Sequence, residues 1–319
     1  MEANLRDFLT SRRARLSPAD AGLPASPTPR RRSGLRREEV AALAGVSVDY
    51  YARLEQGRIG RVSDQVLVAI ENALRLDALE RAHLRALVDV TTKKARRRPA
   101  ERLIVRGGLA DLVDRLDPMP AMIQSRRMDV LAINRACKVL LADFDEMPGK
   151  ERNIARWLFL DPVARVRYPD WDQVARTTVA ALRGAHDPRF QDPELERLVG
   201  ELTVASSDFA KWWADYGLAK HTSGDKRIFH EAVGVLDLQY QNFCVPDADG
   251  QTLTVYTAPR GSAADEKLRL LLSWDATQTP DEWSVNRDAP EDRASLSSTK
   301  IRPSVAFQDP VDRLDERTT

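Results

Sequence analysis

The sequence has little cysteine, histidine or aromatic side chain, and it has no long apolar run. Its two cysteines, Cys137 and Cys244, give no disulfide framework and no metal-ligand spacing, so we expect two buried free thiols in a reducing cytoplasm. No apolar stretch approaches the roughly 18 residues that a membrane span requires. The charged residues Glu2, Arg6 and Asp7 also argue against a signal peptide. These absences predict a cytoplasmic protein without a membrane span.

The sequence also lacks the motifs of common enzyme classes. It contains no Gly-x-Ser-x-Gly nucleophile elbow, no glycine-rich phosphate loop, no His-Glu-x-x-His motif and no cysteine pairs with zinc spacing. His230 and Asp237 could be drawn into a catalytic site, but no nucleophile motif accompanies them. We therefore predict a protein that is not an enzyme and that requires no cofactor or metal.

What the sequence does contain is an uneven distribution of charge over its 319 residues. Residues 1–106 hold 22 Lys and Arg against 13 Asp and Glu, whereas the rest of the chain holds 27 against 35. A basic front part is typical of a nucleic-acid-binding module, and an acidic remainder indicates a second module with another task. A chain of this length accommodates two domains.

Residues 33–58 predict two short helices joined by a glycine turn. Arg36–Ala44 carries an apolar stripe at helical spacing, and Gly45 can end this helix with a left-handed backbone. Ser47 is placed to cap the next helix. The residues expected to face inward are Val46, Tyr51 and Leu54. The residues expected to face outward are Val48, Asp49, Tyr50 and Arg53.

An outward-facing helix end of this kind fits the DNA major groove. Arg53 could bind guanine through two hydrogen bonds or could contact phosphate alone. Tyr50 and Val48 could pack against a thymine methyl group. Asp49 could accept a hydrogen bond from cytosine, or it could simply complement the helix dipole. We favour base contact for Tyr50 and Arg53 and leave both alternatives open for Asp49 and Val48.

This segment resembles the helix-turn-helix of phage-repressor-like regulators of the xenobiotic response element (XRE) family. The resemblance rests on Glu-Glu-Val-Ala at 38–41, Gly-Val-Ser at 45–47 and Leu-Glu-Gln-Gly-Arg at 54–58. It implies a DNA-binding domain of about five helices, which fits further helices at Asn4–Leu16, after Ser63 and at Leu79–Val88. Family members usually have glutamine where this chain has Arg37, so phosphate contact is the expectation for Arg37. The DNA-contacting residues predicted in this domain are Arg36, Arg37, Ser47, Val48, Asp49, Tyr50, Arg53 and Arg58.

Basic segments flank the predicted domain. Ser17–Gly34 contains four prolines, which exclude a helix, and it ends near Arg30, Arg31 and Arg32. This arginine triplet could reach a minor groove or a row of phosphates, or it could form a solvated loop; we favour DNA contact. Thr91–Arg106 predicts a basic linker that could touch the DNA backbone or act as a solvated hinge.

From Gly107 onward the pattern indicates strands, then helices, then strands again. The predicted strands are Pro120–Gln124, Met128–Ile133, Lys226–Tyr240 and Thr252–Thr257. Helices are expected near 109–116, 134–143, 155–160, 171–183, 193–203, 207–213 and 266–272. This order predicts an α+β domain in which helices fold over one face of an antiparallel sheet.

The second half resembles the MmyB-like ligand-binding domain that follows such helix-turn-helix units in actinobacteria. The segments that carry the resemblance are Asp129–Asn134, Arg152–Asn153, Phe159–Asp161, Glu201–Ser206, Phe209–Trp213, His230–Gly234 and Thr254–Ala258. The resemblance implies a PAS-like fold with an apolar cavity for a small molecule, and a fatty acid is a known type of occupant in the family.

Large side chains of this half could line such a cavity, although for any one of them taken singly a place in an ordinary core is favoured. The candidates are Trp157, Phe159, Phe209, Trp212, Phe229, Tyr240 and Tyr256. Trp212 and its neighbour Trp213 cannot both face inward on one helix. Arg227 and His230 are candidates for holding the carboxylate of an acidic ligand.

The resulting domain prediction is a helix-turn-helix domain at 1–90, a basic linker at 91–106, a PAS-like ligand-binding domain at 107–274 and a disordered tail at 275–319. The tail holds only seven Leu, Ile, Val or Phe, too little apolar surface to offset the entropy of ordering. We predict a transcription regulator that binds a double-stranded DNA operator as a homodimer and senses a small apolar ligand such as a fatty acid. The alternatives are a C-terminal half that binds a protein partner and an enzyme fused to a DNA-binding unit.

Overall fold

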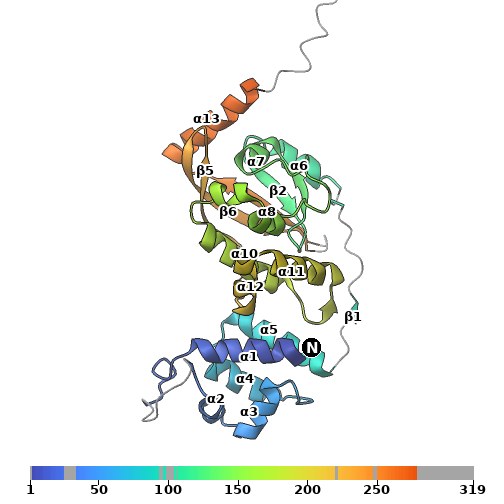
Figure 1. Cartoon of the computed structure of the whole chain (residues 1–319), viewed down its shortest axis with the longest axis vertical. Helices are drawn as coiled ribbons and strands as arrows, with labels where there is room; N and C mark the ends of the chain where they lie inside the picture. The colour runs from blue at the N-terminus through green and yellow to red at the C-terminus, as the bar shows by residue number, and fades with distance from the viewer. Residues whose placement is uncertain are drawn as a thin grey trace, which may run out of the picture. The chain divides into compact units, whose positions relative to one another are not determined.

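The computed structural model describes residues 2–24, 34–92, 96–97, 104–105, 107–219, 222–246 and 250–278. The predictions for Arg30, Arg31 and Arg32, for most of the basic linker and for the tail from 279 onward lie outside these residues. Met1–Gln278 form one unit, in which a helical bundle precedes a sheet covered by helices (Figure 1).

The N-terminal bundle contains the five predicted helices. They are α1 (Glu2–Arg15), α2 (Arg37–Ala44), α3 (Val48–Glu55), α4 (Asp64–Ala73) and α5 (Ala78–Thr92). Gly45 ends α2 with a φ of 64°, which confirms the predicted left-handed turn. Tyr51 and Leu54 are buried with Phe8, Val40 and Ile70 in a common core. The inward face predicted for α3 is therefore confirmed.

A buried carboxylate joins the first three helices of the bundle. Glu55, the last residue of α3, is fully buried. Its carboxylate accepts hydrogen bonds from Arg13 Nε of α1 at 3.1 Å and from Arg37 Nε of α2 at 2.9 Å. Burying a charge is costly unless it is paired, and these two arginines supply the partners. Glu55 thus fixes the position of α3 against α1 and α2.

The second domain is built on one antiparallel sheet of five strands in the order β3-β2-β7-β6-β5. The strands are β2 (Ala121–Gln124), β3 (Val130–Ile133), β5 (Ser223–His230), β6 (Gly234–Cys244) and β7 (Thr252–Thr257). The first strand of this sheet along the chain, β2, pairs with the last one, β7, so the two ends of the domain meet within the sheet. This topology agrees with the predicted α+β, PAS-like domain.

Helices cover both faces of this sheet. Most of the helices share one hydrophobic core on one face of the sheet. They are α7 (Arg135–Leu140), α8 (Ile154–Leu160), α9 (Pro162–Arg167), α10 (Trp171–Ala185), α11 (Pro193–Ala205), α12 (Ser207–Ala214) and α13 (Ala263–Gln278). Helix α6 (Leu109–Arg115) contributes Val113 to a smaller core on the other face, with Ala121, Ile123 and Val255. Alternation along β2 explains this division, because Met122 points to the larger core.

Four details differ from the sequence prediction. The prediction placed the helices over one face of the sheet, but α6 packs against Ala121, Ile123 and Val255 on the other face. The run Lys226–Tyr240 is two strands, because residues 231–233 turn the chain between β5 and β6. Helix α9 was not predicted; Asp161 caps it and Pro162 begins it. Helix α13 continues to Gln278, so the first residues of the predicted disordered tail are helical.

Two further observations concern the linker and the cysteines. Within the predicted linker, β1 (Arg96–Arg97) pairs in parallel with β4 (Phe190–Gln191).

Cys137 is a buried free thiol as predicted, but Cys244 is exposed, so the prediction of burial was wrong for it. Cys244 is the last residue of β6, beyond Gln241, where the pairing of β6 with β5 ends.

The buried Glu55 gives a first prediction. Replacing Glu55 with glutamine removes the negative charge that Arg13 and Arg37 share. We expect the free energy of unfolding to fall by about 3 kcal/mol in urea denaturation, because the partly buried arginine of α1 then lacks its counter-charge. The matched Glu38→Gln variant alters a side chain that is 61% exposed and should cost about 0.5 kcal/mol or less. Equal losses in both variants would contradict the role given to Glu55.

Candidate DNA-binding and ligand-binding sites

Helix α3 presents one face to solvent at its N-terminal end. The Ser47 hydroxyl accepts a hydrogen bond from the Tyr50 backbone N–H at 3.1 Å, as an N-cap does. Val48 is 50% exposed, and Tyr50 is half-buried. The Asp49 and Arg53 side chains are exposed and form an ion pair with each other. The four side chains predicted to read bases therefore lie together beside the cap.

The ion pair on α3 affects what Arg53 can contact. Hydrogen bonding and charge from Arg53 hold the pKa of the Asp49 carboxyl below its ordinary value, so Asp49 is negatively charged at neutral pH. A guanine or phosphate must therefore compete with Asp49 for the Arg53 guanidinium. Because the pair is exposed, this competition costs little.

The other arginines predicted to contact DNA differ in their surroundings. Arg37 is tied to Glu55, yet its side chain is still 43% exposed. Arg36 lies 3.3 Å from Glu38 across the start of α2. Arg58 is exposed beyond the end of α3. Arg37 thus has a structural role in the bundle in addition to any contact with phosphate.

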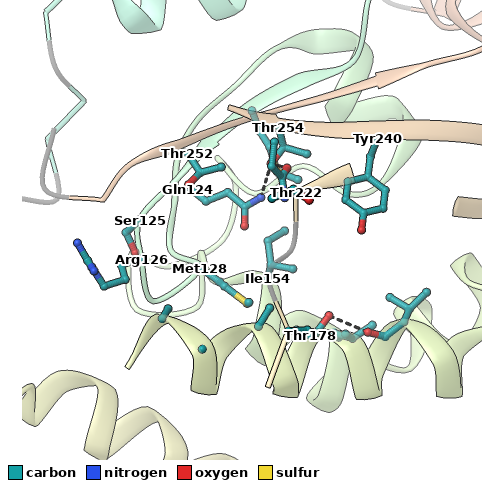
Figure 2. Close-up of a pocket in the computed structure, with 18 of the residues that line it drawn as sticks. Gln124, Ser125, Arg126, Met128, Ile154, Thr178, Thr222, Tyr240, Thr252 and Thr254 are labelled. Carbon is teal, nitrogen blue, oxygen red and sulfur yellow. Dashed lines mark hydrogen bonds between the residues drawn. The ribbon is translucent and has the colours of Figure 1, made fainter. Parts of the chain in front are cut away.

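The second domain contains a cavity of about 530 Å³ between the sheet and helices α8 and α10. A volume of this size is typical of small-molecule sites. Its apolar lining includes Met122, Met128, Ile154, Leu158 and Val174. In Figure 2, Gln124, Thr254 and Tyr240 approach the cavity from the sheet, and Ile154 and Thr178 approach it from the helices.

Polar side chains at one end of the cavity are bonded to one another. Gln124 Nε2 donates to Thr254 Oγ1 at 2.7 Å, and Thr254 Oγ1 donates to Asn242 Oδ1 at 2.7 Å (Figure 2). This row crosses β2, β7 and β6. On the helical side, Thr178 Oγ1 donates to the Val174 carbonyl of its own helix at 2.8 Å. These polar groups are therefore satisfied within the protein.

Most of the aromatic residues predicted to line the cavity form a core beside it. Phe159 contacts Phe209 and Trp212 with ring centroids 5.1 Å and 6.2 Å apart, and Trp157 is buried near Tyr168. None of the four predicted residues in this group lines the cavity as the structure describes it. Trp212 is buried whereas its neighbour is half-buried, in agreement with the prediction that the two cannot both face inward.

Of the remaining predicted residues, Tyr240 and Tyr256 line the cavity. Arg227 lies outside it, 51% exposed and 3.3 Å from Asp170. The Phe229 carbonyl accepts a hydrogen bond from Arg167, and Phe229 is not among the lining residues. His230 Nδ1 accepts the Ala232 backbone N–H at 3.2 Å in the turn after β5. The structure thus brings together two tyrosines of the predicted set and separates them from the predicted cations.

The cation that does line the cavity is Lys226, which sequence reasoning missed. Lys226 is buried on β5, and its Nζ lies 5.4 Å from the Tyr168 ring centroid and 5.2 Å from that of Tyr240. Burial lowers the pKa of Lys226 to about 8. The alternation of side chains along a strand could have identified Lys226. Lys226, Ile228 and His230 form the buried face of β5, whereas Arg227 faces outward.

Tyr216, another residue that the sequence did not single out, follows α12 but is buried in the core of the helical bundle. Its carbonyl accepts a hydrogen bond from Arg12 Nη2 at 2.8 Å, and its hydroxyl lies 3.3 Å from His83 Nε2. The Arg183 guanidinium of α10 lies over the Tyr216 ring at 3.9 Å. One tyrosine therefore contacts α1, α5 and α10.

A capped, exposed helix in a helix-turn-helix bundle and a cavity in a PAS-like domain define a DNA-binding transcription regulator with a ligand-binding domain. The family described as the MmyB-like transcription regulator ligand binding domain matches residues 105–271, and a helix-turn-helix domain family matches residues 28–84. The chain belongs to the MmyB-like transcription regulators. Both resemblances noted in the sequence are confirmed. No curated protein matches the chain.

Every helix among the described residues is too short or too polar to cross a bilayer. In the same residues, no three or more His, Cys, Asp or Glu side chains gather where they could hold a metal ion.

The contact between His83 and Tyr216 gives a second prediction. Burial lowers the pKa of His83 to about 4, against an ordinary value near 6.5. The unfolded chain therefore binds the proton first, and the stability that depends on neutral His83 is present above pH 6.5 and is lost as the pH falls toward 4. We expect the free energy of unfolding to drop by about 2 kcal/mol more in the wild type than in His83→Phe between pH 7 and pH 5.

Urea denaturation of both proteins at the two pH values measures this difference. His186 is half-buried and also has a lowered pKa, so it adds a similar loss to both proteins, and the comparison cancels it. Identical pH slopes for the wild type and His83→Phe would show that His83 is protonated without cost in the folded protein.

Proposed function

We propose that the protein is a cytoplasmic, non-enzymatic regulator that binds operator DNA as a homodimer. Its affinity for DNA changes when a small amphipathic ligand, such as a fatty acid, binds in the cavity of the second domain. The observation that carries this proposal is the position of α10. One side of α10 lines the cavity through Thr178, Ala181 and Gly184, and the same helix holds Arg183 over Tyr216.

The DNA-binding part of the proposal rests on the exposed end of α3. Tyr50 and Arg53 lie beside the N-cap, where side chains of a helix placed in the major groove meet base edges. Arg36 and Arg37 at the start of α2 and Arg58 beyond the end of α3 suit phosphate contacts. Helix α3 alone can read only a few base pairs, so specificity requires a second copy on a second half-site.

The ligand-binding part rests on the shape and chemistry of the cavity. Its size suits one small molecule, and methionine, isoleucine, leucine and valine side chains form much of its lining. An apolar chain in this space would pack against these side chains and gain dispersion contacts. A fatty acid meets these requirements because it combines an apolar chain with one polar group.

The coupling between ligand and DNA follows from the packing of α10. Adding a Cβ at Gly184 would bring it 2.7 Å from the Ala219 carbonyl oxygen, so α10 and the segment after Tyr216 are in direct contact. A ligand that shifts α10 therefore presses on this segment and on Arg183. Because Tyr216 is buried against α1 and α5, the shift reaches the bundle that carries α3. A ligand that binds both arrangements equally would have no effect.

The role of α3 gives a third prediction. An operator is first selected from random DNA duplexes with the full-length protein. Replacing Tyr50 and Arg53 together with alanine should weaken operator binding by about 3 kcal/mol, because each good base contact contributes about 1–3 kcal/mol. Binding to unrelated DNA should change much less, since phosphate contacts dominate it.

Fluorescence anisotropy at a fixed salt concentration measures both affinities, and Arg6→Ala serves as the control. Arg6 is exposed on α1, so this variant removes the same positive charge away from α3. Unchanged operator preference in a folded Tyr50→Ala/Arg53→Ala protein would refute the assignment of α3 to base recognition.

The coupling through α10 gives a fourth prediction. In Arg183→Met, the stack on Tyr216 loses its charge while the cavity keeps its lining. We expect this variant to bind decanoic acid within about twofold of the wild type, but to lose most of the change in operator affinity that decanoic acid produces. Calorimetry gives the ligand affinity, and anisotropy with and without decanoic acid gives the coupling. If the operator affinity of the wild type is the same with and without bound decanoic acid, this acid does not control DNA binding.

A further inference from the structure

We propose that Lys226 is the anion-binding group of the cavity, so that the regulator selects amphipathic acids and places their anionic head between Tyr168 and Tyr240. This inference rests on the proposed function, since it names the chemistry that the ligand-binding domain recognises. It also replaces Arg227, one of the two cations that the sequence had suggested, by its neighbour on the opposite face of the same strand.

The ammonium group of Lys226 lies at the wall of the cavity, between two tyrosine rings. Lys226 is 9% exposed and lines the cavity together with Tyr168 and Tyr240. Its Nζ lies within 5.4 Å of both ring centroids, so two aromatic faces border the charge. Both tyrosines line the cavity as well. An anion that approached Nζ from the cavity would therefore meet the charge within an aromatic pocket.

The buried charge of Lys226 has no anionic partner within the part of the chain that the structure describes. Among the described residues, no carboxylate forms an ion pair with Lys226, and burial is the only cause of its lowered pKa. A buried ammonium normally requires an opposite charge, and ring faces compensate only part of the loss of water. A ligand carboxylate would supply the missing charge. The mainly apolar lining would hold the ligand chain.

A second cation, Arg126, also lines the cavity and must be distinguished from Lys226. Arg126 lies in the turn between β2 and β3 and is half-buried. Figure 2 shows it apart from Tyr240, beyond Ser125. Its guanidinium is within 3 Å of where a Cβ on Gly250 would lie, so it is held against the loop before β7. This geometry favours Lys226 as the anchor and makes Arg126→Met a necessary comparison.

The surroundings of Lys226 predict a distinct pH dependence. The titratable groups near Lys226 are three tyrosines and one cysteine. Burial raises the pKa of each of them: Tyr168 after α9, Tyr240 of β6, Tyr256 of β7 and Cys137 of α7. Asp225, next to Lys226 on β5, is exposed and raises the pKa of Tyr240 further. Between pH 7 and pH 9, Lys226 is therefore the group of this cluster that changes charge.

The test measures binding of decanoic acid and decanol to the full-length protein by titration calorimetry. The two probes share one apolar chain and differ in the head group. We expect the wild type to bind decanoate about ten- to a hundredfold more tightly than decanol at pH 7, because a hydrogen bond to a charged group is strong. Lys226→Met should remove this preference and leave decanol binding unchanged.

Arg227→Met is the matched control, since it removes a positive charge one residue away on the outward face of β5. It should retain the wild-type preference for decanoate, as should Arg126→Met. The Lys226→Met protein removes an uncompensated buried charge, so it should unfold at a temperature no lower than the wild type. That measurement separates loss of the anchor from loss of the fold.

The pH dependence provides an independent readout. The wild-type affinity for decanoate should be constant below about pH 8 and should then weaken by up to tenfold per pH unit, because free Lys226 loses its proton and must regain it on binding. Calorimetry in buffers of different ionisation enthalpy should show uptake of about half a proton at pH 8. Lys226→Arg should keep the preference for decanoate and lose this pH dependence.

The outcomes separate this inference from the proposed function. Equal wild-type affinity for decanoate and decanol, or a preference lost in Arg126→Met and kept in Lys226→Met, would overturn the role of Lys226 while ligand binding stands. Binding of neither probe would overturn both the anchor and the proposed fatty-acid ligand. A preference for decanoate that depends on Lys226 and weakens above pH 8 would establish the inference.

Discussion

The stack of Arg183 on Tyr216 is the contact on which the arrangement of the two cores depends. Arg183 is buried between the rings of Trp213 and Tyr216, 3.8 Å and 3.9 Å from their centroids. Tyr216 has a φ of 54°, a backbone conformation that costs a non-glycine residue free energy and persists only when its surroundings impose it. Here the surroundings are Arg12 and His83 of the bundle on one side and α10 on the other. Helix α10 therefore cannot move without affecting both cores.

Local pattern was sufficient to predict the helix-turn-helix and most of the strands. Gly45 and Ser47 mark helix ends through backbone chemistry that acts within a few residues, and the burial of Tyr51 follows from helical spacing. The structure agrees at all three positions. The hairpin at 231–233 was missed because its turn lacks the Asn-Gly or Asp-Gly pair that marks such turns, so β5 and β6 read as one strand.

The cavity was harder to predict because its lining depends on contacts between distant segments. Phe159, Phe209 and Trp212 pack against one another, so the largest side chains fill the core instead of the cavity. The space remains beside them, where smaller residues of α10 such as Ala181 and Gly184 face the sheet. Size alone therefore indicated the wrong residues. The alternation along β5 did contain the distinction between Lys226 and Arg227, but only once the burial of Ile228 was known.

Each of the two domains contains a buried charged side chain, Glu55 in the first and Lys226 in the second. The two differ in whether the protein itself supplies an opposite charge. Glu55 is buried with arginines from two other helices at hydrogen-bond distance, so its charge is compensated before any partner arrives. Lys226 is buried against tyrosine rings and the cavity. The first arrangement is rigid because one carboxylate holds both arginines, and removing Glu55 leaves them without this counter-charge. The second leaves part of the cost of burial in the free protein, and a ligand anion would remove that cost. The same physical penalty thus fixes the fold in one domain and favours binding in the other.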